Sequence, residues 1–290
     1  MYNISFLDES FDSNISSSYF LSIQITLDGF SFCTLDPIRN RFIQFYHQNW
    51  EDGNIVRTSL NTKCLDQFEK IINSESLLDL PFKKIFLLYG ASSFSLVPSV
   101  LFASGNLKEL FKLTHPFDEN CQLLFTKVRL TDSYLLFPIE SDWLTLLNSR
   151  FEHLQISHTN AITLEALSLY NKVGKAKNNI TLSFTSKGFD IFAFSDTSLL
   201  MANHFDYQSD ADFLYFFLFV FEQLKFTVDD TEVHIIGLIK EDSSLILQLR
   251  QFVKKVSFKQ VSKSISFSYQ FKQLPQYEFF SLFNLPVCVS

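Results

Sequence analysis

The sequence predicts a duplicated α+β protein, with two lobes that each hold a β-sheet and flanking helices. Two observations predict this fold class. First, the same order of elements (three strands, a helix and a fourth strand) occurs twice along the 290 residues. Second, 47% of the residues are hydrophobic and only 19% are charged, so each copy has enough apolar side chains for a core of its own. The length suits two domains of ordinary size.

The first copy follows residues 1–18, which are rich in Ser, Asp and Asn and are predicted to form a flexible arm. Leu21, Ile23 and Ile25 alternate with more polar residues, which is typical of a half-buried strand. Asp28-Gly29 predicts a tight turn, because glycine adopts the positive φ angle that such hairpins need. The other elements of this copy are predicted strands at residues 30–35 and 42–46, a helix at 60–73 and a buried strand at 85–89.

The second copy repeats the first hairpin at an offset of 188 − 29 = 159 residues, which is the distance from Gly29 to Gly188. At this offset the apolar residues of the first strand meet apolar residues, and Thr26 meets Thr185 without a gap. Internal duplication explains this repeated order. The elements of the second copy are predicted strands at residues 180–185, 189–194 and 201–205, a helix at 210–225 and a buried strand at 233–236.

Further elements lie between and after the two copies. They are predicted strands at residues 123–130, 134–139 and 265–271, helices at 143–150, 161–171 and 245–256, and a Phe-rich tail. The sequence therefore predicts a first lobe over residues 19–172, with an insertion at about 94–150. A second lobe is predicted over residues 173–290.

A three-stranded meander followed by a helix, a strand and a helix, present twice, resembles the actin-like superfamily of sugar kinases, actin and chaperone ATPases. Short motifs in a fixed order also resemble domain-of-unknown-function family 3822, a bacterial family similar to degenerate actin-like proteins. These motifs are residues 94–98, His115-Pro116 and residues 200–205, 212–215 and 281–285. The resemblance implies a ribonuclease H-like fold with a mixed five-stranded sheet in each lobe. It implies no activity, and a role in ribosome maturation is only a weaker suggestion.

The glycines argue against the common nucleotide-binding motifs. Only seven are present, and the closest two, Gly174 and Gly188, are 188 − 174 = 14 positions apart. A dinucleotide fingerprint or a P-loop needs several glycines within one turn. Actin-like ATPases instead hold phosphate and Mg²⁺ between two Asp-x-Gly hairpins, because carboxylates orient the water ligands of the metal. Here Leu27 and Ser186 stand two positions before the hairpin glycines, so we expect that ATP hydrolysis has been lost.

A vestigial cleft is still expected between the lobes. Its residues are predicted to be Gln24, Asp28, Gly29, Thr185, Gly188 and Gly237. The turn explains Asp28, and Gly237 stands alone where the superfamily has paired glycines. No catalytic residue and no metal site are predicted, because the four cysteines lack a C-x-x-C pair and the histidines lack a ligand spacing.

The net charge and the apolar runs indicate which partners and which cellular compartment to expect. The 24 basic and 31 acidic residues give a net charge of −7, which argues against a broad nucleic-acid surface. The N-terminus lacks the basic start of a signal peptide, and the longest apolar run, residues 213–221, is too short to span a membrane. We therefore expect a cytoplasmic protein. The apolar run predicts a helix that is either covered on all sides or exposes one face to a partner.

The sequence thus predicts a non-catalytic binding or scaffold protein that needs no cofactor and acts through a protein partner or self-association. Phe-rich surfaces or the cleft would form the contact, and a small molecule in the cleft stays an open alternative. A different class is a divergent ATPase or small-molecule kinase that holds ATP and Mg²⁺ around the predicted cleft residues. A weaker alternative is an RNA-associated factor, whose contact would be the lysines at positions 254, 255, 259, 263 and 272.

Overall fold

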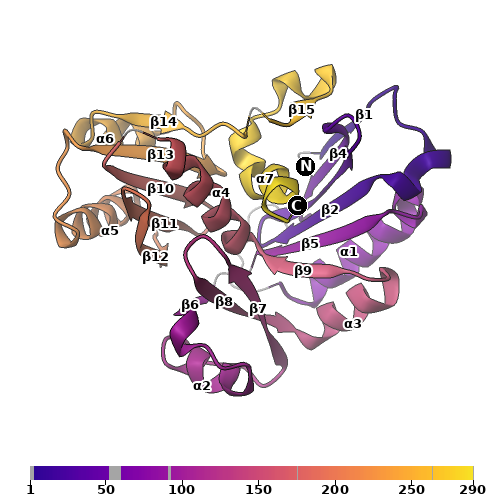
Figure 1. Cartoon of the computed structure of the whole chain (residues 1–290), viewed down its shortest axis with the longest axis horizontal. Coiled ribbons are helices and arrows are strands. Elements are labelled where there is room, and N and C mark those ends of the chain that lie inside the picture. The colour runs from indigo at the N-terminus through magenta and orange to yellow at the C-terminus, as the bar shows by residue number, and fades with distance from the viewer. Residues whose placement is uncertain (1–2, 52–59, 91–92, 175, 263, 290) are drawn as a thin grey trace.

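Two lobes and a smaller inserted sheet make up the computed structural model, which describes residues 3–51, 60–90, 93–174, 176–262 and 264–289. Figure 1 shows the lobes side by side, with the inserted sheet below them. The predicted duplicated α+β architecture is confirmed, because the two large sheets share one strand order.

Lobe I is built on a mixed sheet. Its described strands are β1 (Asn3–Leu7), β2 (Phe20–Thr26), β3 (Gly29–Asp36), β4 (Arg41–Asn49), β5 (Lys84–Gly90), β9 (Gln155–His158) and β15 (Ser266–Phe267). They lie in the order β1-β4-β3-β2-β5-β9, and β15 also pairs with β4. β2, β3 and β4 form the predicted antiparallel meander, while β5 and β9 run parallel to β2.

Lobe II repeats five adjacent strands of lobe I, those from β4 to β9 in the order of the sheet. Its described strands are β10 (Asn178–Phe184), β11 (Gly188–Ser195), β12 (Ser198–Asp206), β13 (Thr231–Gly237) and β14 (Val256–Phe258). Their order, β12-β11-β10-β13-β14, corresponds strand for strand to β4-β3-β2-β5-β9. The meander is again antiparallel, and the last two strands are again parallel to its first strand.

The duplication extends to the strand register. Ile25 pairs with Phe30 in lobe I, and 159 positions later Phe184 pairs with Phe189 in lobe II. The irregularity between residues 34 and 35 of β3 also recurs 159 positions later, in β11. An irregularity of this kind bends a strand locally, so the two meanders share their curvature as well as their order.

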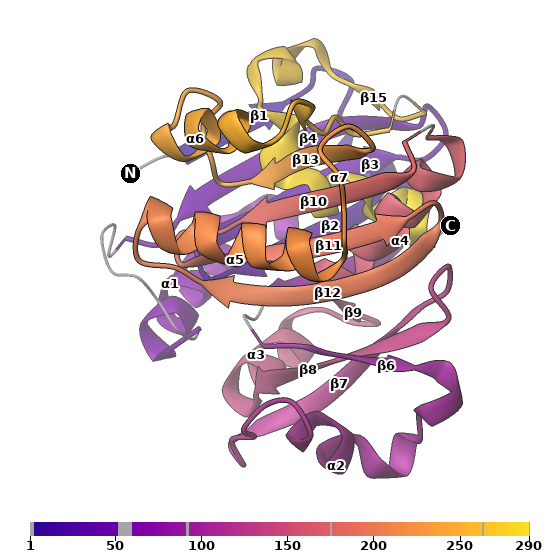
Figure 2. The same cartoon turned by 90° about the vertical axis from the view of Figure 1, so that its left-hand side faces the viewer.

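Helices pack on both sheets (Figure 1). They are α1 (Thr62–Ser74), α2 (Leu107–Lys112), α3 (Ser141–Arg150), α4 (Thr159–Val173), α5 (Asp210–Gln223), α6 (Ser244–Phe252) and α7 (Phe280–Val289). Figure 2 shows α5 and α6 in front of the sheet of lobe II. α4 is buried from residue 160 to residue 168, and the His158 side chain caps it by accepting the Asn160 N–H at 3.1 Å.

The inserted subdomain is a small antiparallel sheet. Its strands are β6 (Ser95–Pro98), β7 (Cys121–Val128) and β8 (Ser133–Glu140), in the order β6-β8-β7. The sequence predicted β7 and β8 but not β6, because four residues are too few for an alternating pattern to be recognised. The buried Glu165 of α4 anchors this sheet to lobe I, since its carboxylate accepts the backbone N–H groups of Arg129 and Leu130.

The insertion ends earlier than predicted, at about residue 140, because α3 packs with lobe I. Trp143 of α3 lies against Phe68 of α1, with 5.3 Å between the ring centroids. Its indole N–H donates to the carbonyl of Leu60 at 2.8 Å. These contacts make α3 part of the core of lobe I.

The prediction of a flexible arm is wrong for the N-terminal segment. β1 pairs in antiparallel fashion with residues 44–48 of β4. Just beyond it, the Asp8 carboxylate accepts a hydrogen bond from Arg41 at 3.1 Å, and a 3₁₀ helix follows at Ser13–Ser18. Ile4 and Phe6 pack on the core of lobe I, but two apolar residues among polar neighbours do not reveal a strand.

The C-terminal tail packs on lobe I, so the predicted second lobe of residues 173–290 is too long. β15 pairs in parallel with residues 41–42 of β4. Phe283 of α7 contacts Phe42 and Phe45, with centroid distances of 5.0 and 5.5 Å. The chain therefore returns to the first lobe after β14. The sequence could not show this return, because apolar side chains of the tail suit either core.

Two predictions for lobe II also need correction. The predicted helix at 245–256 ends at Phe252, and the predicted strand at 265–271 is reduced to β15 and a 3₁₀ helix, Tyr269–Gln273. Lys254 and Lys255 consequently lie between α6 and β14, where they pair with Asp229 and Glu232 at 2.6 and 3.4 Å. Lys263, another of the five lysines proposed for RNA contact, lies outside the described residues.

The apolar run at 213–221 lies in α5 and has one exposed face. The helix begins with the predicted capping box of Ser209 and Asp212. Phe217 and its buried neighbours pack on the sheet of lobe II. Tyr215 is 65% exposed and Phe219 is 48% exposed, so the helix is not covered on all sides.

Candidate functional site between the lobes

The turns of the two meanders have the same internal hydrogen bonds. Thr26 Oγ1 donates to the carbonyl of Gly29 at 3.3 Å, and Thr185 Oγ1 donates to the carbonyl of Gly188 at 3.1 Å. In both turns the threonine oxygen also accepts the N–H of the residue two positions on. Side-chain bonds of this kind fix a turn locally, which explains why both hairpins have one shape.

The glycines of these turns are required by close backbone approach. A Cβ atom at Gly29 would lie 2.4 Å from the carbonyl oxygen of Gln48, and one at Gly188 would lie 2.4 Å from that of Phe205. Both separations are shorter than any non-bonded contact of a real Cβ atom. Gly29 and Gly188 thus let β3 and β11 approach the next strand, and both lie behind the cleft rather than in its lining.

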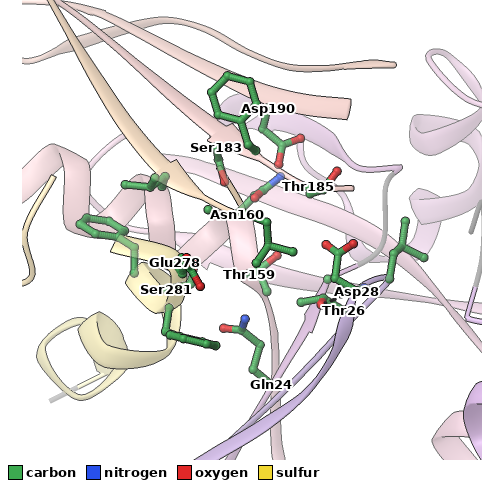
Figure 3. Close-up of a pocket in the computed structure, with 18 of the residues that line it drawn as sticks. Gln24, Thr26, Asp28, Thr159, Asn160, Ser183, Thr185, Asp190, Glu278 and Ser281 are labelled. Atoms are coloured by element: carbon green, nitrogen blue, oxygen red, sulfur yellow. Dashed lines mark hydrogen bonds between the residues drawn. The ribbon is translucent and has the colours of Figure 1, made fainter. Parts of the chain in front are cut away.

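A hydrogen bond crosses the cleft between the two turns. The backbone N–H of Ser186 in lobe II donates to Asp28 Oδ1 in lobe I at 3.2 Å. The two hairpins therefore face each other, and the side chain of Asp28 lies between them (Figure 3).

A polar cavity of about 90 Å³ lies beside this contact. Of the six predicted cleft residues, Gln24, Asp28, Thr185 and Gly237 line it. Figure 3 shows that its walls come from both hairpins, from the start of α4 and from the segment that begins α7. Polar side chains of the lining that were not predicted include Ser31, His47, Asn160, Asp190, His204 and Glu278.

Two histidines face the cavity from equivalent places in the two lobes. His47 Nδ1 lies 2.8 Å from Ser31 Oγ, and His204 Nδ1 lies 2.9 Å from Asp190 Oδ1. Each pair bridges the second and third strands of its meander, at matching positions of the register. The duplication therefore placed a hydrogen-bonded histidine in each wall of the cleft, but only lobe II gives it a charged partner.

The different partners shift the two histidine pKa values in opposite directions. Burial lowers the pKa of His47, and a hydrogen bond with Asn49 opposes this only in part. Burial also acts to lower the pKa of His204, but the hydrogen bonds and charges of Asp190 and Asp206 outweigh it and raise that pKa. A carboxylate close to an imidazole stabilises its protonated form. The wall of lobe II therefore holds a proton more readily.

The C-terminal tail contributes an acid to the cavity. Tyr277, Glu278 and Phe279 belong to the 3₁₀ helix Gln276–Phe279, and they line the cavity together with Phe280 and Ser281. Burial raises the pKa of Glu278 to about 7, although Lys240 opposes this shift. The tail thus narrows the cleft and places a carboxyl group there that is partly protonated near neutral pH.

Gln24 brings an unsatisfied acceptor to the cavity. Its Oε1 atom is buried and has no hydrogen-bond partner in the described part of the chain. Figure 3 shows the amide of Gln24 directed toward the cavity. A buried acceptor without a partner is costly, so this site suits a small ligand or solvent molecule that donates a hydrogen bond.

A comparison with protein families shows to which family the chain belongs. The model of the family described as "Protein of unknown function (DUF3822)" matches residues 8–256. The chain belongs to this family. No curated protein matches the sequence.

Solved structures show the fold of this DUF3822 member. A Bacteroides thetaiotaomicron protein with an actin-like ATPase fold and unknown function is similar over 86% of this chain and 93% of its own, with 23% identity and a TM-score of 0.77. The PilM–PilN type IV pilus biogenesis complex is similar over 92% of this chain and 96% of the matched chain, with 10% identity and a TM-score of 0.59. The actin-like ATPase fold expected from the resemblance is confirmed.

The cleft of this DUF3822 member is lined by many side chains that can form hydrogen bonds. Leu27 and Ser186 stand two positions before the hairpin glycines, and neither can bind the water ligands of Mg²⁺ as a carboxylate does. In the described ranges no group of three His, Cys, Asp or Glu residues is arranged to hold a metal ion. Within the same ranges no helix is long and apolar enough to cross a membrane.

Sequence reasoning missed the histidine pairs and the tail. The 159-residue offset aligns Ser31 with Asp190. Their equivalence could therefore have been found by extending the alignment two residues beyond the turn glycines. His47 and His204 differ by 157 residues, because the loop before the third strand is two residues shorter in lobe II. The tail residues at 277–281 carry no sequence signal for the cleft, because only the folded chain brings them to it.

Proposed function

We propose that this protein acts by binding a partner protein and does not turn over ATP. The cross-lobe hydrogen bond of Asp28 is the observation that carries the proposal. Phosphate and Mg²⁺ would have to pass between the hairpins, and there the carboxylate of Asp28 accepts the N–H of Ser186. A carboxylate that bridges two turns in this way holds the lobes together instead of orienting a metal.

The size of the cavity supports the same proposal. Pockets that enclose a drug-sized ligand have volumes of roughly 300–1,000 Å³. The cavity here measures about 90 Å³, and the aromatic side chains of Phe279 and Phe280 form part of its wall. A nucleotide in this cavity would need the lobes to separate and the tail to move. The closed cleft is therefore better suited to a hinge than to a nucleotide site.

A protein partner is favoured by the exposed aromatic face of α5. Tyr215 and Phe219 stack on each other, with 6.3 Å between their centroids, and both lie at the surface. Aromatic side chains are enriched in protein interfaces. PilM, which shares this fold, forms a complex with PilN, so a fold of this kind is compatible with a protein partner.

Calorimetric titration with Mg-ATP, combined with an assay of phosphate release, tests the proposal. We expect no heat of binding at submillimolar nucleotide and no phosphate release above the buffer background. The variant Leu27→Ala serves as a control, because it enlarges the cleft without adding an acid. Submillimolar binding with phosphate release by the unaltered chain would overturn the proposal.

The free acceptor of Gln24 favours a second candidate, a small molecule held in the cleft. This candidate includes the divergent ATPase or kinase predicted from the sequence. Its occupant would donate a hydrogen bond to Gln24 Oε1, which lacks a partner among the described residues. Native mass spectrometry of the purified protein tests it: a retained mass that is lost in Gln24→Ala supports a ligand, and a bare chain mass in both proteins contradicts one.

A further inference from the structure

The outer edge of β12 in lobe II is an unpaired strand edge. β12 has nine residues and, among the described residues, pairs with β11 alone. Figure 2 shows it as the outermost strand of its sheet, on the side of the inserted subdomain. Such an edge presents a row of free N–H and C=O groups, and an extended chain can pair with it.

The corresponding edge in lobe I is covered by the chain itself. β4 is the counterpart of β12, and β1 pairs with it in antiparallel fashion at residues 44–48. His47 and His204 occupy the same register position, at an offset of 204 − 47 = 157. The stretch of β12 that corresponds to the site of β1 is therefore residues 201–205. The pairing of β1 with β4 in lobe I thus indicates that the equivalent edge of β12 in lobe II can accept an antiparallel strand.

The hydrogen bonds next to β12 show which of its residues face outward. Tyr207, just after β12, donates its N–H to the carbonyl of Lys187, just before β11, so the register places the backbone groups of Phe205, Asn203 and Met201 toward β11. In lobe I the carbonyl of Ile43 faces outward and accepts the Asp8 N–H at 2.8 Å. Ile43 corresponds to Leu200 at the same offset. The register therefore directs the backbone groups of Ala202 away from β11, and the comparison with Ile43 places the carbonyl of Leu200 on the same outer edge.

Most of this edge lacks the usual protection against pairing, since His204, whose imidazole is held by Asp190, is the one ionisable side chain in residues 198–205. Natural edge strands carry lysine, proline or inward-pointing charges, and residues 198–203 contain none of these. Leu200 is 48% exposed. An aromatic face accompanies the edge, because Phe216 of α5 stacks on Phe205 of β12 with 5.0 Å between the centroids and lies next to Tyr215.

We propose that the edge of β12 binds an extended segment of a partner protein, which adds an antiparallel strand opposite residues 201–205. The segment would carry apolar side chains at alternating positions, as β1 does with Ile4 and Phe6, because one of its faces would lie beside the aromatic residues of α5. This inference deepens the proposed function, since it names the surface and the kind of partner. Main-chain hydrogen bonds would supply affinity, and the aromatic face would supply specificity.

Selection from a phage-displayed library of random linear peptides, each of about 12 residues, tests the inference on the full chain. We expect enriched peptides with alternating apolar residues. Their affinity should fall at least about tenfold for Leu200→Lys, which places a charge at the edge. Ala202→Pro should have the same effect, because it removes an outward N–H and leaves the ladder with β11 intact. The control Leu247→Lys, at a residue of α6 that is 54% exposed, should bind normally.

Backbone methylation of an enriched peptide gives the decisive result. Methyl groups on alternate peptide nitrogens should abolish binding, and those on the intervening nitrogens should leave it unchanged, because only every second N–H of a strand faces its neighbour. The inference would be overturned if no peptide were enriched, or if neither Leu200→Lys nor methylation changed the affinity of the enriched peptides. A dimer in sedimentation that Leu200→Lys dissociates would also overturn it, by making the occupant a second copy. None of these peptide-binding and sedimentation results bears on ATP turnover, which the nucleotide assays test separately.

Discussion

Asp28 and Ser186 lie 158 positions apart in the chain, and the backbone N–H of Ser186 donates to the Asp28 carboxylate at 3.2 Å. The two residues belong to matching turns of the duplicated hairpin. Each turn is closed by its own threonine, so the bond between them joins two rigid units. We therefore regard it as one of the contacts that hold the lobes together, beside the packing of Phe192, Phe194 and Ile236 of lobe II on the core of lobe I.

Removal of this carboxylate should loosen the contact between the lobes. We expect Asp28→Ala to increase hydrogen exchange at the Ser186 amide by about fivefold, because the net value of such a bond is about 1 kcal/mol. Exchange measured by mass spectrometry on peptides from residues 183–188 checks this expectation. Asp229→Ala, at an exposed aspartate of lobe II, is the matched control and should leave these amides unchanged. Equal protection in Asp28→Ala would mean that the bond does not hold the lobes.

The two cleft histidines should titrate differently. NMR titration of the imidazole signals should give His204 a pKa above 6.5 and His47 a pKa below it. Because the pKa of His204 is raised, its stabilising contribution is complete below pH 6.5 and is lost as pH rises through its folded pKa. The lowered pKa of His47 has the opposite sign, and stability falls as pH drops below 6.5. Asp190→Asn should lower the pKa of His204 alone, and a joint shift of both signals would contradict this account.

Glu278 should make the protein less stable at neutral pH than in mild acid. Its folded pKa of about 7 exceeds its ordinary value of 4.5, so the folded state retains a proton that the unfolded chain releases between these values. Stability should therefore decline as pH rises from about 4.5 to 7, by on the order of 1 kcal/mol after solvent screening. Urea unfolding of the unaltered protein and of Glu278→Gln over this range measures the difference. Parallel pH profiles would argue against a buried, protonated Glu278.

The tail should be essential to the stability of lobe I. Phe283 is fully buried against Phe42 and Phe45, so Phe283→Ala should cost about 3–5 kcal/mol in the free energy of unfolding. Denaturant titration followed by circular dichroism measures this cost. Phe252→Ala, at a side chain that is 43% exposed, should cost less than about 1 kcal/mol. A small effect at Phe283 would show that the tail is only loosely attached.

Much of the fold could be predicted because the duplicated elements are locally encoded. Alternating apolar residues and a glycine turn are sufficient to specify a hairpin, and Gly29 and Gly188 placed the two copies in the correct register. Four of the predicted cleft residues line the cavity for the same reason, since they belong to those hairpins or to the strand beside them. β6 and β1 were missed because they are short and take their stability from neighbouring strands.

The sequence by itself determined the duplication, the two matching turns and the presence of Leu27 and Ser186 two positions before the turn glycines, because each depends on residues close together in the chain. Only the tertiary structure decided that the tail packs on lobe I, that Glu278 enters the cleft and that one of two equivalent sheet edges has no covering strand among the residues described. These features depend on which distant segments meet, and an apolar segment contains little information about which apolar surface it will cover.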